Sequence, residues 1–177
     1  MRIIGGNLKG IFIKAPDKLP VRPTTDMAKE ALFNILNHSF DFGECDILDL
    51  FSGTGNISIE FASRNAKRIT SVDKHPACVQ WIKSISQKHQ LTQIHPLKAD
   101  VFKYLQQEKQ QHDIIFADPP YDLPNIPAIA QLVIEHNLLK PDGLLIIEHP
   151  SMLKLDQKPG FSECRKYGNS SFSFFRN

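Results

Sequence analysis

From residue 46 onward, hydrophobic residues alternate between short continuous runs and helically spaced positions. The short runs predict strands at 46–51, 69–73, 94–98, 113–117 and 143–148. The stretches between the runs predict helices at 56–66, 76–89, 100–108 and 126–138. Because strands and helices alternate, the sequence predicts an α/β fold with a parallel sheet covered by helices on both faces.

The C-terminal end of the chain departs from this alternation. Residues 161–167 and 171–176 predict two strands joined near Gly168-Asn169, a pair that suits a tight hairpin turn. The sheet is therefore expected to be seven-stranded and mixed, with an antiparallel hairpin at its C-terminal end.

The N-terminal end carries a smaller pattern. Residues 2–4 and 11–13 predict a small hairpin, and Thr25 is predicted to be the N-cap of a helix whose apolar positions share one face. We therefore divide the chain into an N-terminal extension, residues 1–40, and a main domain, residues 41–177.

Composition is that of an ordinary globular protein, with 41% hydrophobic and 23% charged residues. No apolar run approaches the length of a membrane span, and the N-terminus lacks a signal-peptide pattern, so we expect no membrane association. Three widely spaced cysteines indicate reduced thiols and a cytoplasmic protein.

The net charge of +2 is unevenly distributed. Residues 1–29 contain six Lys and Arg residues against two Asp residues, which gives +4 and leaves −2 for the rest of the chain. A basic segment of this kind suits nucleic-acid contact, and it equally suits a solvated surface arm. Charge alone leaves both interpretations open.

A glycine-containing loop follows the first predicted strand of the main domain. It comprises Phe51, Ser52, Gly53, Thr54 and Gly55 and opens a helix. Glycines let the backbone approach a ligand closely, and the N-terminus of a helix attracts a carboxylate or phosphate. The third glycine of the dinucleotide fingerprint is absent, because the chain has a serine at position 58.

Three acidic residues lie at or near the carboxyl ends of successive predicted strands. Asp49 lies in the first, Asp73 ends the second and is followed by Lys74, and Asp100 ends the third and is followed by Val101. Open α/β sheets bind ligands at this edge, so the three together favour a nucleoside cofactor. Individually they could equally be a buried cap, a turn residue and the N-cap of the next helix.

The fourth predicted strand ends in Asp118-Pro119-Pro120-Tyr121. Two consecutive prolines fix the backbone, so carbonyl groups and the Asp118 carboxylate form a rigid set of acceptors beside an aromatic ring. This combination suits a planar base bearing an NH₂ group. The alternative is a simple turn that terminates the strand.

The residues described above resemble a known family over nearly the whole chain. The motifs that carry the resemblance are Arg2-Ile3-Ile4-Gly5-Gly6, Lys9-Gly10, Arg22-Pro23-Thr24-Thr25-Asp26, Asp49 through Gly55, and Asp118 through Tyr121. Together they look like the RsmD-type bacterial 16S rRNA guanine-N2 methyltransferases, which have a Rossmann-like class I methyltransferase fold. The N-terminal motifs make the match specific, because the DPPY loop also occurs in adenine-N6 and cytosine-N4 enzymes.

This resemblance implies methyl transfer from S-adenosylmethionine to one guanine N2 of 16S rRNA, within the small ribosomal subunit. The cofactor contacts expected on these grounds are Asp49, Phe51, Ser52, Gly53, Thr54, Gly55, Asp73, Lys74, Asp100 and Val101. Asp118 to Tyr121 would form the catalytic loop, and Lys9, Arg22 and Lys29 would contact RNA. We expect a monomer. The chain departs from many relatives at Ile11, where they carry a basic residue.

Three other functions compete with this one. A DNA adenine-N6 methyltransferase would use the same DPPY loop, and a non-catalytic RNA-binding assembly factor could retain the fold. An NAD-dependent oxidoreductase fits less well because of Ser58 and the terminal hairpin. The seven histidines lack metal-ligand spacing, so no metal is expected, and a structural role or a substrate contact suits His149 equally.

Overall fold

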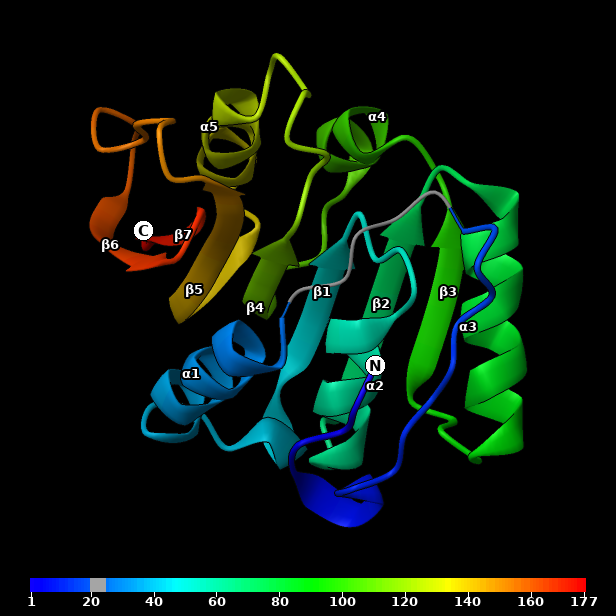
Figure 1. Cartoon of the computed structure of the whole chain (residues 1–177). Coiled ribbons are helices and arrows are strands. Elements are labelled where there is room, and N and C mark those ends of the chain that lie inside the picture. The colour runs from blue at the N-terminus through cyan, green and yellow to red at the C-terminus, as the bar shows by residue number, and fades with distance from the viewer. Residues whose placement is uncertain (20–24) are drawn as a thin grey trace.

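The computed structural model of the chain describes residues 1–19 and 25–177. Its centre is a seven-stranded sheet with the order β3-β2-β1-β4-β5-β7-β6 (Figure 1). The strands are β1 (Asp46–Leu50), β2 (Arg68–Asp73), β3 (Ile94–Lys98), β4 (His112–Ala117), β5 (Leu139–Pro150), β6 (Phe161–Tyr167) and β7 (Ser170–Phe175). The first five strands are parallel, and β7 is antiparallel to both β5 and β6. The predicted mixed sheet with a terminal antiparallel hairpin is confirmed.

Five α-helices and two short 3-10 helices accompany the sheet in the described part of the chain. They are η1 (Gly6–Leu8), α1 (Asp26–Asn37), η2 (Phe42–Glu44), α2 (Asn56–Ser63), α3 (Pro76–Lys88), α4 (Val101–Gln107) and α5 (Pro127–Glu135). Buried residues of α1, α2 and α3 share one core cluster with one face of the sheet, and those of α4 and α5 share a second cluster with the other face. Helices therefore cover both faces, as the alternating pattern predicts.

Two helices end three residues earlier than predicted, and the backbone shows why. Helix α2 stops at Ser63 because Asn65 has a positive φ of 62°, and α5 stops at Glu135 because Asn137 has a φ of 52°. Asparagine tolerates this left-handed conformation, which ends a helix. Strand β5 begins earlier than predicted, because its pairing with β4 continues past a register shift next to His112.

The N-terminal hairpin is smaller than predicted. A single antiparallel bridge, Arg2 to Phe12, replaces the two expected strands, and η1 lies between its arms. Thr25 is the N-cap of α1, where its hydroxyl accepts a hydrogen bond from the Ala28 N–H at 3.3 Å.

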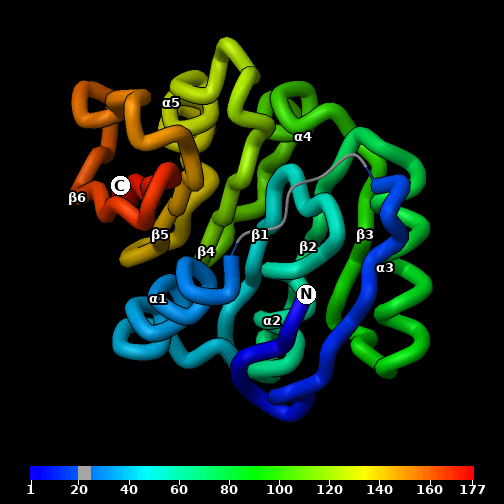
Figure 2. The backbone as a smooth tube through the Cα atoms, viewed as in Figure 1, coloured from blue at the N-terminus to red at the C-terminus, as the bar shows by residue number. Residues whose placement is uncertain are grey.

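Residues 1–19 and 25–40 contribute side chains to the main core. Ile3, Ile13, Leu32 and Phe33 are buried in the same cluster as residues of β1 and α2. The N-terminal segment, drawn in dark blue, runs alongside α2 (Figure 2). The boundary at residue 40 therefore separates two stretches of sequence that bury one common core.

In the part of the chain that the structure describes, every helix is too short or too polar to cross a membrane.

Candidate active site

The parallel strands bring several of the predicted site residues to one edge of the sheet. The loop after β1 and the carboxylate that ends β2 meet there, because the Gly53 N–H donates to Asp73 Oδ2 at 2.8 Å. The loop after β4 joins them, where the Asp118 N–H donates to the Leu50 carbonyl at 3.4 Å. The glycine loop and the DPPY loop are therefore neighbours, as expected for the carboxyl edge of an open α/β sheet.

The glycine loop has the conformation that its sequence suggests. Gly53 and Gly55 have positive φ values of 53° and 76°, and a Cβ added to Gly55 would lie 2.9 Å from Ile82 Cγ1. Phe51 also has a positive φ, 59°, which is uncommon for a residue with a large side chain. Backbone strain of this kind is concentrated at ligand-binding turns.

Ser52 has a polar group that is available to a ligand of the glycine loop. Its hydroxyl oxygen is buried, and it has no hydrogen-bond partner within the described residues. A buried polar group without a partner destabilises a protein by about 1–3 kcal/mol unless a ligand or water satisfies it. The loop therefore suits a polar ligand group at the N-terminus of α2.

Asp73 and Asp100 have different local roles. Asp73 is 5% exposed, and its two carboxylate oxygens accept backbone N–H groups from Gly53 and His75, each at 2.8 Å. Each oxygen has a second lone pair, so the carboxylate can still accept ligand hydroxyls. Asp100 is exposed and is the N-cap of α4, accepting from the Lys103 N–H at 3.1 Å.

The residues beside these two acids form an apolar surface next to an exposed cation. Val101 is 3% exposed, and the rings of Phe51 and Phe102 meet edge to face with centroids 6.3 Å apart. Lys74, directly after Asp73, is exposed. Apolar packing beside a carboxylate suits a flat heteroaromatic ring with a sugar attached.

Asp49 contacts α2, so its observed contacts are structural. Its Oδ2 accepts from the Ser58 N–H at 3.1 Å and from the Ser58 hydroxyl at 2.5 Å. Asp49 is 2% exposed, and this burial raises its pKa from the usual 3.8 to about 7. Ser58, which the sequence marked only as a missing glycine, anchors the strand to the helix.

The shifted pKa of Asp49 makes part of the stability depend on pH. Between about pH 4 and pH 7 the folded protein holds a proton that the unfolded chain releases. This stabilisation is complete below about pH 4 and is lost as the pH rises to about 7, by at most about 1.4 kcal/mol per pH unit. Asp49→Asn removes the titration, so its unfolding free energy should rise relative to wild type across this range.

Urea unfolding between about pH 4.5 and pH 8 measures this difference. Asp122→Asn, on the exposed loop after the DPPY motif, is the matched control and should follow the wild-type profile. A constant difference between Asp49→Asn and wild type at every pH would contradict the assignment.

The DPPY loop presents its residues at the edge of the sheet. Asp118 is partly exposed, Pro119 is buried, and Pro120 and Tyr121 are exposed. The Tyr121 hydroxyl donates to Glu148 Oε1 at 3.3 Å, and burial raises the pKa of Tyr121 to about 12. The tyrosine therefore stays protonated at neutral pH, and the residue is 37% exposed at this edge.

Glu148, which holds Tyr121 from β5, was not predicted from the sequence. Its carboxylate is 5% exposed, and the signal available in the sequence was an acidic residue directly after the apolar run 144–147. His149, the next residue, is 1% exposed and bonds the Ser173 hydroxyl at 2.7 Å. Its Nδ1 bonds the Pro150 carbonyl at 2.9 Å, and burial lowers its pKa. These contacts give His149 a structural role.

The predicted RNA contact at Lys29 is wrong. The side chain is fully buried, and its ammonium group donates to the Arg2 carbonyl at 2.5 Å and to Asn56 Oδ1 at 2.8 Å, and pairs with Glu60 at 3.2 Å. A cation inside the protein cannot reach a phosphate on its surface. Lys9 is exposed, and Arg22 lies outside the described residues.

Glu60 explains what the N-terminal glycine motif does. Its fully buried carboxylate accepts the N–H groups of Ile4 and Gly5 at 3.0 and 2.8 Å and pairs with Arg64 at 2.9 Å. A Cβ on Gly6 would lie 1.8 Å from the Ser63 carbonyl oxygen. The motif therefore attaches the N-terminal segment to α2.

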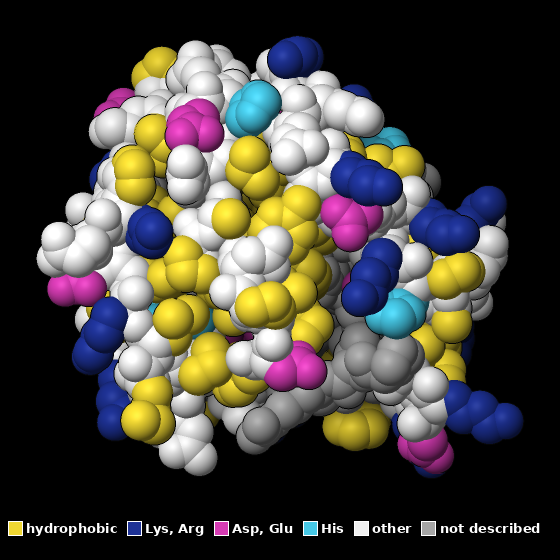
Figure 3. Space-filling model, turned by 90° about the horizontal axis from the view of Figure 1, so that it is seen from above, with side chains coloured by type: hydrophobic (Ala, Val, Ile, Leu, Met, Phe, Trp, Pro, Cys, Tyr) yellow, Lys and Arg dark blue, Asp and Glu magenta, His cyan; other side chains and the backbone are white. Residues whose placement is uncertain are grey.

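The surface above this edge is largely apolar near its middle (Figure 3). Hydrophobic side chains gather near the middle of this face, and Lys and Arg side chains lie mostly toward its margins (Figure 3). Among the described residues, no cluster of three or more His, Cys, Asp or Glu side chains is arranged to hold a metal ion.

The chain matches one family along its length. The sequence model of the family described as Conserved hypothetical protein 95 matches residues 1–176. A relative from Buchnera aphidicola subsp. Baizongia pistaciae, Ribosomal RNA small subunit methyltransferase D, is 33% identical over 154 residues. The match covers 86% of this chain and 78% of the relative.

Solved structures share the fold. A hypothetical protein from a Thermus thermophilus strain has a TM-score of 0.86 at 25% identity, covering 100% of this chain and 99% of its own. A T. thermophilus 16S rRNA N2 G1207 methyltransferase, solved in complex with AdoMet and guanosine, has a TM-score of 0.75 at 23% identity, over 99% of this chain and 49% of its own. The fold is thus the Rossmann-like fold of class I methyltransferases. The chain belongs to the Conserved hypothetical protein 95 family, the family of ribosomal RNA small subunit methyltransferase D.

Proposed function

We propose that this protein transfers a methyl group from S-adenosylmethionine to the exocyclic N2 amine of a guanine in 16S rRNA. The observation that carries the proposal is the junction of two loops, where the Asp118 N–H bonds the Leu50 carbonyl directly before the glycine loop. This junction brings a rigid set of acceptors next to a loop suited to a nucleoside ligand. Membership of the rRNA methyltransferase family supports the substrate class.

The residues in and around the glycine loop fit the cofactor. Ser52 has a buried hydroxyl in need of a partner, and Asp73 can accept ribose hydroxyls through its remaining lone pairs. Val101 and Phe102 would pack against the adenine, with Asp100 at its edge. Asp49 would lie near the cofactor ammonium, which would favour its charged form. When bound, S-adenosylmethionine supplies a methyl group already activated by its sulfonium.

The DPPY loop acts on the base. An aromatic exocyclic amine is a poor nucleophile because its lone pair is delocalised into the ring. The Asp118 carboxylate and the neighbouring carbonyls would accept the two N–H protons, favour the localised lone pair and stabilise the positive charge that develops on nitrogen. Tyr121, oriented by Glu148, would stack on the base. Holding the nitrogen in line with the methyl carbon can supply about 7–11 kcal/mol.

The wider context is part of the same proposal. RNA phosphates would contact the basic N-terminal segment through Lys9 and Arg22, and the substrate would be the small ribosomal subunit in the cytoplasm. We expect the protein to act as a monomer. Lys29 has no part in RNA binding, because it is buried.

A methyl-transfer assay tests the function. Tritium from labelled S-adenosylmethionine is followed into duplex DNA, naked 16S rRNA and small subunits from a strain that lacks the gene. We expect incorporation into rRNA or subunits, and mass spectrometry should locate it on one guanine N2. Incorporation into DNA alone would identify an adenine-N6 enzyme, and no incorporation despite RNA binding would identify a non-catalytic assembly factor.

A further inference from the structure

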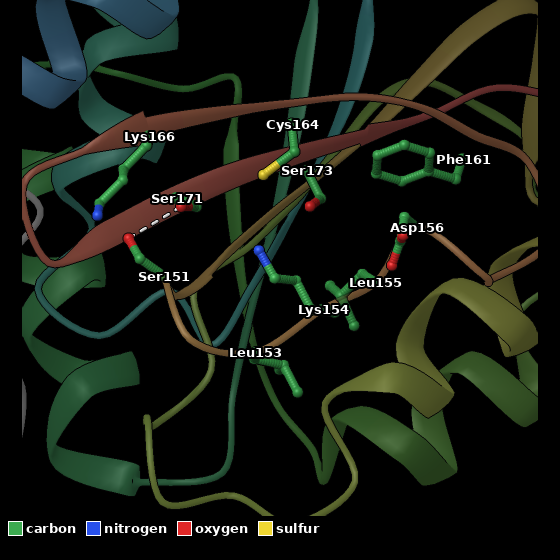
Figure 4. Close-up of a pocket in the computed structure, with 10 residues that line it drawn as sticks. All are labelled: Ser151, Leu153, Lys154, Leu155, Asp156, Phe161, Cys164, Lys166, Ser171 and Ser173. Atoms are coloured by element: carbon green, nitrogen blue, oxygen red, sulfur yellow. Dashed lines mark hydrogen bonds between the residues drawn. The ribbon is translucent and has the colours of Figure 1, made fainter.

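A cleft lies beside the proposed active site. It has a volume of about 220 Å³ and is enclosed by the segment that follows β5 and by β6 and β7 (Figure 4). The function proposed above does not use this cleft.

The cleft has a basic, hydroxyl-rich part and an apolar part. Lys166, Ser151 and Ser171 lie in the first part, with Lys154 directed toward Ser173 in the middle of the cleft (Figure 4), and the Ser151 and Ser171 hydroxyls lie 2.9 Å apart. In Figure 4 the Lys166 ammonium lies toward the end where the two serines meet, whereas Asp156 lies toward the other end with Leu155 and Phe161. The serine pair uses one of its two hydroxyl protons internally, and the Ser151 hydroxyl also lies 3.4 Å from the Gly168 carbonyl. The ammonium groups and the remaining hydroxyl proton are donors suited to a phosphate.

Both lysines are available to a ligand. They are exposed, and within residues 1–19 and 25–177 neither makes an ion pair with a carboxylate. The carboxylate in the cleft, Asp156, lies away from the serines in Figure 4. The part of the cleft around the serines is therefore positive.

Strand β7 connects the cleft to the catalytic loop. Tyr121 interacts with Ser170, the first residue of β7, and with Glu148 of β5. Ser171, the next residue, lines the cleft, and it pairs with His149, next to Glu148. Successive residues of a strand face opposite sides of the sheet. Tyr121, next to Ser170, and the cleft, next to Ser171, therefore lie on opposite faces of the sheet near the start of β7.

We propose that this cleft binds a backbone phosphate of the RNA strand next to the target nucleotide, through Lys154, Lys166 and the hydroxyls of Ser151 and Ser171. The inference rests on the proposed rRNA methyl transfer and adds a contact that positions the substrate. A strand whose target base stacks on Tyr121 would cross the start of β7 and place its next phosphate in the cleft. The contact reads no base, so it contributes affinity and alignment without sequence specificity.

The Lys154→Gln/Lys166→Gln double variant tests the contact. We expect its KM for RNA to rise several-fold with kcat nearly unchanged. The slope of log affinity against log salt concentration should fall by about 0.7–1 for the phosphate lost. S-adenosylhomocysteine affinity and Tm should match wild type, because neither lysine contacts the glycine loop.

Lys67→Gln/Lys88→Gln is the matched control, because it removes the same charge from two exposed lysines far from the cleft. Lys67 directly precedes β2, and Lys88 ends α3. It should leave KM and the salt slope close to wild type. Equal effects of the two double variants would show general electrostatic attraction and overturn the proposal, as would an unchanged KM in Lys154→Gln/Lys166→Gln.

Two further results distinguish a failure of the cleft proposal from a failure of the proposed methyl-transfer function. If inorganic phosphate binds wild type in a lysine-dependent way but does not compete with RNA, the cleft is a site for free phosphate and the proposal is wrong. If wild type methylates no RNA, the proposed function fails; the cleft assignment then stands only if RNA binding still depends on Lys154 and Lys166.

Discussion

Asp118→Ala should lower the rate of methyl transfer by about 10²–10³-fold, the loss typical of removing one preorganised group that stabilises charge in the transition state. Asp118 directly follows β4 in the rigid Pro-Pro loop and is partly exposed at the edge of the sheet, where the target amine would lie. Its carboxylate can accept an N–H and oppose the positive charge on the attacking nitrogen. Alanine keeps the backbone and removes both effects.

The measurement is a single-turnover rate with rRNA or small subunits, because this rate isolates the chemical step from product release. S-adenosylhomocysteine affinity by calorimetry and Tm should change little. Asp122→Ala, four residues further along the same loop and exposed, is the matched control and should retain nearly full activity. A normal rate for Asp118→Ala would remove Asp118 from the catalytic mechanism.

Lys29→Met should reduce the unfolding free energy by about 3–5 kcal/mol, the usual loss when one partner of a buried ion pair is removed. The methionine would fill much of the same volume, but the Arg2 carbonyl and Asn56 would lose a donor and the buried Glu60 would lose one of its two cations. Burial lowers the pKa of Lys29, and the Glu60 charge partly offsets that effect. We expect Tm to fall by roughly 10 °C.

Urea and thermal unfolding measure this loss. Lys9→Met replaces an exposed lysine of the same N-terminal segment and should change stability by less than about 0.5 kcal/mol. Lys29→Met/Glu60→Gln should recover part of the loss, because the uncompensated buried charge is then absent. Wild-type stability for Lys29→Met would contradict the burial of its ammonium group.

Burial gives Lys9 and Lys29 different roles. The sequence grouped Lys29 with Lys9 and Arg22 as RNA contacts because all three lie in one basic segment. Burial assigns Lys29 to the core instead, so the N-terminal segment offers RNA less positive charge than its sequence suggests. Its glycine motif serves to attach the segment to α2, through the Glu60 carboxylate.

The sequence by itself determined the features that depend on local pattern. The alternation of apolar runs and helical spacing predicted the order of strands and helices, because each period reflects a repeating backbone geometry. The Gly53-Thr54-Gly55 turn, the Thr25 cap and the Asp118-Pro119-Pro120-Tyr121 loop were also predicted, because the conformations of glycine and proline and the capping preference of threonine are local properties.

The tertiary structure alone decided which of these residues have partners. Asp49 bonds Ser58, Lys29 pairs with Glu60, and Tyr121 bonds Glu148, and these partners are 9, 31 and 27 residues apart in the sequence. The hydrophobicity of a segment does not encode contacts between distant segments, and a charged residue has the same letter whether it is buried or solvated. The role of each charge therefore became defined only when packing fixed its burial and its neighbours.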